Sequence, residues 1–268
     1  MVLSDRARRF VKRLPAGRAL WRFGWALDEH GAFRAASAMA FDAFLSGIPL
    51  LALTGWSMHR VDPESVLLGS IVRLATGPAA QIADADLLRL SDQAVMTLAP
   101  IGVVGFVWLS SSGLATAMGV CEIMFAAEQR TWWRRRVTAM SWVIVALAVL
   151  ALGAAATLGL IHLIGPAGGV VAALLAAPIL VALVVAFFRT AIRRPRGMRR
   201  RVLPGALLTV ALWALVSVLF TAYVQSVARY SYFYGSLAAV AMLLIWLWLL
   251  SIALLVGGEL NVQLEGVR

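Results

Sequence analysis

The chain contains 268 residues, of which 62% are hydrophobic and 14% are charged, and its mean hydropathy is +0.86. A soluble globular protein carries about 25% charged residues, so this composition excludes an ordinary soluble domain. The formal net charge of +11 would suit a nucleic-acid-binding protein. Most basic residues, however, fall in three segments (6–34, 130–136 and 189–201), a pattern typical of the cytoplasmic parts of a membrane protein. We therefore expect a polytopic membrane protein that does not bind nucleic acid.

We expect an all-α fold with six transmembrane helices, together with amphipathic N-terminal and periplasmic helices. The cytoplasmic segment 1–34 is basic, and residues 17–30 have the pattern of an amphipathic helix that lies in the headgroup layer or packs on the bundle. The membrane domain covers residues 35–264, and a cytoplasmic tail covers 265–268. Its apolar runs approach the roughly 20 residues that cross a bilayer. They are 35–57, the second from residue 94, 137–164, 169–188, 202–224 and 235–257, with a periplasmic helical insertion at 59–93.

The distribution of charge predicts the orientation of these helices. The arginine-rich segments 130–136 and 189–201 alternate along the chain with segments that carry no excess of positive charge. Because cytoplasmic loops are enriched in Arg and Lys, we expect both termini to lie in the cytoplasm of a bacterium, with the helices in its inner membrane. The basic loops would contact the anionic lipids of the inner leaflet. Their candidate residues are Arg134, Arg135, Arg136, Arg199, Arg200 and Arg201.

The residues that usually form catalytic or metal sites are scarce. Cys121 is the only cysteine, which excludes an intramolecular disulfide, and His30, His59 and His162 lie far apart in the sequence. The sequence contains no glycine-rich phosphate loop, no GxSxG motif and no HExxH motif. We therefore predict no metal, no cofactor and no enzymatic activity.

Polar residues inside the first span are the clearest functional signal. Asp42, Ser46 and Pro49 recur at the spacing that places residues on one face of a helix. A carboxylate in the membrane costs roughly 2.5–3.5 kcal/mol on insertion scales, and Pro49 frees a backbone carbonyl one turn earlier. This face could line a substrate or ion path. Alternatively, Asp42 could pair with an arginine such as Arg34 or bond to a neighbouring helix.

Five further residues are candidates for the same path. Ser112 and Thr116 lie in the second predicted helix, where small and hydroxyl residues allow close packing and interhelical hydrogen bonds. Glu122 lies near the inner end of that helix, and Glu259 and Asn261 follow the sixth span. The two glutamates could instead form structural ion pairs.

Several stretches resemble the YihY/BrkB family of bacterial inner-membrane proteins. They include "AASAMAFDAFLSGIPLLAL" (35–53), "RTWWRRRVTAM" (130–140) and, most specifically, "YGSLAAVAMLLIWLWLLSIALLVGGELN" (234–261). The resemblance extends over residues 31–264. It implies six transmembrane helices and an envelope-related role such as transport of lipid-like substrates, and the older family label "ribonuclease BN" is regarded as mistaken. The family typically carries tyrosine at the position of Asp42, which indicates a polar interior there.

Two hypotheses of function follow. The first is a transporter or flippase-like protein that moves an amphipathic or charged envelope-related solute through a polar cavity lined by the first, second and sixth helices. The second is a non-transporting membrane scaffold, whose internal polar residues would all be paired. Expected partners are anionic membrane lipids and an unidentified small-molecule or lipid substrate, and the chain could form a homo-oligomer. A nuclease is disfavoured because the basic loops lack adjacent carboxylate metal ligands.

Overall fold

The computed structural model describes residues 15–60, 92–191, 201–227 and 235–265, and in these ranges every regular element is an α-helix. The prediction of an all-α polytopic membrane protein is confirmed. A short helix, α2, precedes six helices of 25 residues or more. In chain order the helices are α2 (Pro15–Glu29), α3 (Ala32–Arg60), α6 (Asp92–Met124), α7 (Trp132–Ile164), α8 (Pro166–Ala191), α9 (Leu203–Val227) and α10 (Gly235–Glu265).

Five of the described helices are long and apolar enough to cross a membrane: parts of α6, α7, α8, α9 and α10. The first predicted span, 35–57, lies within α3, whose side chains are described only as far as Leu50. Large apolar side chains point outward, including Leu150 and Leu163 of α7 and Leu174 of α8, each about 70% exposed or more. Such surfaces are stable in lipid because acyl chains are as apolar as leucine.

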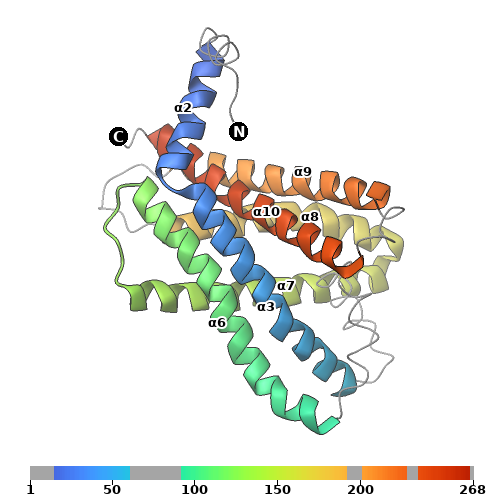
Figure 1. Ribbon diagram of the computed structural model, residues 1–268. Coiled ribbons are helices and arrows are strands. Elements are labelled where there is room, and N and C mark those ends of the chain that lie inside the picture. The colour runs from blue at the N-terminus through green and yellow to red at the C-terminus, as the bar shows by residue number, and fades with distance from the viewer. Residues whose placement is uncertain (1–14, 61–91, 192–200, 228–234, 266–268) are drawn as a thin grey trace.

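The long helices form an up-and-down bundle of sequence neighbours. Figure 1 shows α7, α8, α9 and α10 running alongside one another, while α3 and α6 lie together and cross them diagonally. The residue contacts agree: α3 packs on α6 and α10, α7 packs on α6 and α8, and α9 packs on α10 and α8. In Figure 1, α2 projects from the end of the bundle at which α10 terminates.

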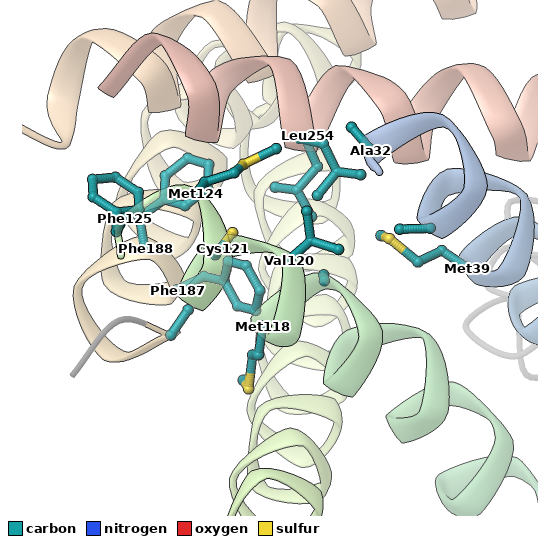
Figure 2. Packing of buried hydrophobic residues seen from close by; sticks show 14 of the residues in the cluster. Ala32, Met39, Met118, Val120, Cys121, Met124, Phe125, Phe187, Phe188 and Leu254 are labelled. Carbon is teal, nitrogen blue, oxygen red and sulfur yellow. The ribbon is translucent and has the colours of Figure 1, made fainter. Parts of the chain in front are cut away.

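Buried apolar side chains cluster near this same end. Figure 2 shows Met118 and Cys121 of α6 beside Phe187 and Phe188 of α8, with Leu254 of α10 close by. All five side chains are buried. The chain's single cysteine is therefore part of the apolar core, where its thiol behaves as a small hydrophobic group.

Several predicted boundaries were wrong, for a common physical reason. The segment 130–136 was predicted to be a loop because it is rich in arginine, but α7 already begins at Trp132. Residues 258–265 were placed beyond the last span, but α10 continues to Glu265, so Glu259 and Asn261 are helical. Charged and polar residues do not end a helix when their side chains find partners inside the bundle. Arg199, Arg200, the tail at 266–268 and most of the insertion at 59–93 lie outside the described residues.

Candidate functional site

A cavity of about 330 Å³ lies between α6 and the start of α7. Ligand pockets in proteins occupy about 300–1,000 Å³, so this cavity could hold a small solute or a headgroup. Its lining combines hydroxyl, amide and guanidinium groups with apolar side chains. The lining residues are Ser112, Ala115, Thr116, Gly119, Val120 and Ile123 of α6, Gln129 of the connection, and Trp132, Arg135 and Arg136 of α7.

The cavity exists because small residues recur along one face of α6. Ser112, Thr116, Gly119 and Ile123 are three or four positions apart and so share a face. Thr116 directs its hydroxyl back to the carbonyl of Ser112, at 3.1 Å, which satisfies the hydroxyl without filling the cavity. A Cβ atom at Gly119 would lie only 3.1 Å from Nη1 of Arg135. The glycine therefore leaves room for this arginine.

Arg136 is the most constrained polar side chain of the lining. It is only 7% exposed, although it belongs to a helix apolar enough to span the membrane. Its Nη2 donates a hydrogen bond of 2.7 Å to the carbonyl of Trp108, and its Cζ lies 4.2 Å from the centroid of the Trp108 ring. Among the described residues, its buried Nε has no hydrogen-bond partner.

Glu122 lies next to the cavity but does not line it. Its fully buried carboxylate accepts a hydrogen bond from the backbone N–H of Arg130 at 3.3 Å. Nε of Arg130 lies 3.7 Å from Oε1, and Nη1 of Arg135 lies 3.9 Å from Oε2. Glu122 thus fixes the connection between α6 and α7 and offsets part of the local positive charge.

The carboxylate of Glu259 makes its contacts away from the cavity, with His30 and Gln263. Its Oε2 lies 3.0 Å from Nδ1 of His30, and its Oε1 accepts a hydrogen bond of 3.3 Å from Gln263. His30 precedes Gly31, whose φ of +70° forms the sharp connection between α2 and α3. The pair therefore joins α10 to this connection.

Asn261 serves the contact between α9 and α10. Its Oδ1 accepts a hydrogen bond of 2.8 Å from the N–H of Gly205, and its Nδ2 donates one of 3.3 Å to the carbonyl of Val202. The first N–H groups of a helix have no partner within it, so Asn261 caps the start of α9. A Cβ atom at Gly205 would overlap the carbonyl oxygen of Gly257, which shows how closely the two helices approach.

Asp42, Ser46 and Pro49 lie along the contact between α3 and α6. A Cβ atom added at Gly113 would lie 3.6 Å from Cβ of Asp42, and one added at Gly105 would lie 3.5 Å from Cγ of Pro49. Asp42 and Pro49 therefore pack closely against α6. Ser46 is buried and donates its hydroxyl to the carbonyl of Ala43 at 2.7 Å. None of these three side chains lines the cavity.

The structure therefore separates the predicted path residues. Ser112 and Thr116 meet Arg135 and Arg136, whereas Glu122, Glu259 and Asn261 take part in three other sets of contacts. The cavity lies between the second and third long membrane helices (α6 and α7), not among the first, second and sixth. Arg136 was expected to lie in a membrane-interface loop but is buried, because its side chain reaches the carbonyl of Trp108. Arg201 precedes α9, and its N–H donates to Oε1 of Glu265 at 3.0 Å.

Sequence reasoning missed the contribution of α7. The available signal was a stretch of small residues in one helix followed directly by consecutive arginines at the start of the next. Among the described side chains, no group of three His, Cys, Asp or Glu residues could hold a metal ion.

Fold and site together define a polytopic helical membrane protein with a polar, arginine-lined cavity near one end of its bundle. The chain belongs to the family described as "Virulence factor BrkB", whose sequence profile matches residues 25–268. This confirms the resemblance noted in the sequence.

Curated relatives agree with this assignment. The chain is 30% identical over 280 aligned residues to the UPF0761 membrane protein Smlt0865 of Stenotrophomonas maltophilia (strain K279a), covering 98% of this chain and 64% of the relative. A UPF0761 membrane protein from strain R551-3 matches with the same identity and coverage. A Bacillus subtilis (strain 168) protein, YfkH, whose name calls it ribonuclease-like, is 42% identical over 66 residues, which are 25% of this chain and 24% of that protein. The chain thus spans less than two thirds of the length of these relatives. No solved structure matches it significantly.

Proposed function

We propose that this protein is a transporter or flippase-like protein that moves an amphipathic or charged envelope-related solute across the bacterial inner membrane. The observation that carries the proposal is the cavity between α6 and α7. It follows α6 from Ile123 to Ser112, which is about 16 Å at 1.5 Å per residue. A row of hydroxyl and guanidinium groups along a membrane helix is costly to maintain, and a solute path accounts for it.

We also propose that both termini lie in the cytoplasm. In support, the described arginines that precede α7 and α9 contact the C-terminal ends of other helices. Arg130 donates a hydrogen bond to the carbonyl of Thr190, which joins the start of α7 to the end of α8. Arg201 bonds to Glu265, which joins the start of α9 to the end of α10. The gathering of arginines at one end fits the positive-inside rule, and the cavity then opens toward the cytoplasm.

The proposed activity requires neither a chemical reaction nor a cofactor, in keeping with a sequence that carries no catalytic or nucleotide-binding motif. Any energy would come from an ion gradient or from the solute's own gradient.

A membrane scaffold is the second candidate, and one observation favours it. Glu259 and Asn261 are held by internal hydrogen bonds, and Glu122 lies in ion pairs with Arg130 and Arg135, as expected for a bundle whose polar groups serve its own packing. Among the described residues, however, Oε1 of Glu122 accepts no hydrogen bond. The scaffold does not account for the cavity.

Access to the cavity from each side of the membrane separates the two candidates. Thr116→Cys in a Cys121→Ser background would be treated with a membrane-impermeant maleimide in right-side-out and inverted vesicles. Transport predicts labelling from both sides, because a solute path must open to each in turn. Leu150→Cys, which faces lipid, is the matched control and should remain unlabelled. Labelling of Thr116→Cys from the cytoplasmic side alone would support the scaffold and overturn transport.

A further inference from the structure

We propose that the cavity between α6 and α7 binds the phosphate group of an anionic ligand, with Arg136 as its main contact. This inference rests on the proposed function, since the ligand would be the solute that the protein moves. It adds the chemical class of that solute, which the cavity's shape alone does not define.

The charge of the lining favours an anion. Two guanidinium groups, those of Arg135 and Arg136, line the cavity together with the hydroxyls of Ser112 and Thr116 and the amide of Gln129. Among the residues that the structure describes, no carboxylate lines it. The closest acidic group in the same cluster, Glu122, is fully buried and already held by Arg130 and Arg135. A cation entering this cavity would meet two positive charges, whereas an anion would be attracted.

Arg136 provides a hydrogen-bond donor that the protein itself leaves unused. The side chain is only 7% exposed, and among the described residues its Nε has no hydrogen-bond partner. A buried charged group with an incomplete set of partners is destabilised. Because Arg136 lines the cavity, an anion bound there would supply a further partner to this guanidinium.

The geometry around Arg136 suits a phosphate in particular. The ring of Trp108 and its carbonyl hold the guanidinium on one side, which fixes the plane of the group before a ligand arrives. Phosphate oxygens match the fork of N–H donors on a guanidinium, and Arg is over-represented at such sites. Arg135 adds a second positive charge, and its Nη1 lies above the gap left by Gly119.

The surroundings of the cavity accommodate either a lipid headgroup or a free phosphate. Trp132 and Ile123 line it and are respectively 60% and 48% exposed, so an apolar chain attached to the phosphate could lie against them. A soluble phosphate would need only the polar part of the lining. A lipid headgroup and a free phosphate would offer the same phosphate oxygens to Arg136.

Binding measurements on the purified full chain would test the proposal and distinguish the two sources. The chain in phosphatidylcholine nanodiscs would be titrated with inorganic phosphate and, separately, reconstituted with increasing phosphatidic acid or with diacylglycerol, which lacks the phosphate. Tryptophan fluorescence would report binding, because Trp108 and Trp132 lie at the site. Saturable binding of phosphate indicates that the free anion suffices, and saturable binding of phosphatidic acid alone indicates a lipid headgroup. Both results support the proposal, whereas an equal response to diacylglycerol, or none to any probe, overturns it.

Variants would assign the binding to Arg136. Arg136→Gln should weaken the affinity by about 10- to 100-fold, whereas Arg134→Gln, its exposed neighbour outside the lining, should leave it near the wild-type value. If Arg136→Gln fails to fold, Arg135→Gln removes the second guanidinium of the lining from a side chain that is only partly buried, and it should weaken binding several-fold. Unchanged affinity in the folded variants would overturn the proposal.

The labelling experiment on transport and the binding experiment on phosphate can succeed or fail independently. Phosphate binding without labelling of Thr116→Cys from both sides would reject transport but retain the site. Labelling from both sides without phosphate binding would retain transport and reject this ligand.

Discussion

The contact between α9 and α10 and the contact between α6 and α7 use similar residues to opposite effect. Both place glycine and hydroxyl side chains between two membrane helices. At the α9–α10 contact, Gly205 and Gly257 bring the backbones together, and the polar atoms of Asn261 and Thr209 are bonded to the backbone of α9 or of the residue before it. At the α6–α7 contact, Gly119 makes room for Arg135, and a buried nitrogen of Arg136 has no partner.

The difference teaches that a polar residue in a membrane helix does not by itself mark a functional path. Small residues promote helix association, and buried polar groups stabilise it when their hydrogen bonds are complete. The informative property is an incomplete set of partners beside an open volume. By that measure Asn261 is a structural residue and Arg136 is a candidate ligand contact. Four substitutions test this distinction, and their expected effects on stability decrease from Gly205→Ala to Gly119→Ala.

The largest effect is expected for Gly205→Ala. The added Cβ would overlap the carbonyl oxygen of Gly257, and a backbone atom cannot move aside without shifting a helix. Overpacking of this kind costs about 3 kcal/mol, so the melting temperature in detergent should fall clearly. Gly153→Ala in α7 is the matched control, because nothing lies within 4 Å of its added Cβ. Equal melting temperatures for the two variants would show that the α9–α10 contact is not closely packed.

Asn261→Leu should have the next largest effect. The two side chains are similar in volume, but leucine leaves the N–H of Gly205 and the carbonyl of Val202 without their partner. Two buried backbone groups that lose a hydrogen bond should cost about 2 kcal/mol. Gln129→Leu, an exposed amide in the connection between α6 and α7, should cost much less. A similar loss of thermal stability in both variants would argue against the capping role.

His30→Ala tests the paired carboxylate at the end of the bundle. The substitution removes the partner that lies 3.0 Å from Oε2 of the buried Glu259. Because the His30 side chain is 26% exposed, water can replace part of the lost bond, and we expect a loss of about 1 kcal/mol in the free energy of unfolding. His162→Ala, at the exposed end of α7, serves as the control in the same unfolding experiment. If the two variants unfold alike, the contact with His30 does not stabilise the junction of α2 and α3.

Most helices of this fold could be predicted from sequence because they are long apolar runs. The run at 137–164 lies within α7, and the run at 202–224 lies within α9 except for its first residue. In lipid, a helix satisfies all backbone hydrogen bonds within its own segment. The ends were harder to predict, because Arg136 and Asn261 look like loop residues until their partners on other helices are known. Trp108 is 28 residues from Arg136, and Gly205 is 56 residues from Asn261.

The candidate site could be predicted only in part, for the same reason. Ser112 and Thr116 were identified from their residue types and lie in the cavity lining. Asp42 was identified from the cost of a charge in the membrane, but it lies at the α3–α6 contact, beside Gly113, and not in the cavity lining. Which helix faces the small residues of α6 depends on tertiary packing, and no periodicity within α6 encodes it.

Gly119→Ala adds one methyl group at the α6–α7 contact, as Gly205→Ala does at the α9–α10 contact, so the two variants compare the contacts directly. At Gly205 the added methyl meets backbone, whereas at Gly119 it meets Nη1 of Arg135 at 3.1 Å, the far end of a flexible side chain. The arginine can move by a few tenths of an ångström, so the free energy of unfolding should change by about 0.5 kcal/mol or less. The cavity, however, would lose volume and the placement of one guanidinium, so phosphate should bind several-fold more weakly. Gly159→Ala, whose added Cβ meets nothing within 4 Å, should change neither property. A large loss of stability in Gly119→Ala would mean that the α6–α7 contact is packed like the α9–α10 contact, and unchanged phosphate binding would mean that Arg135 does not contribute to the site.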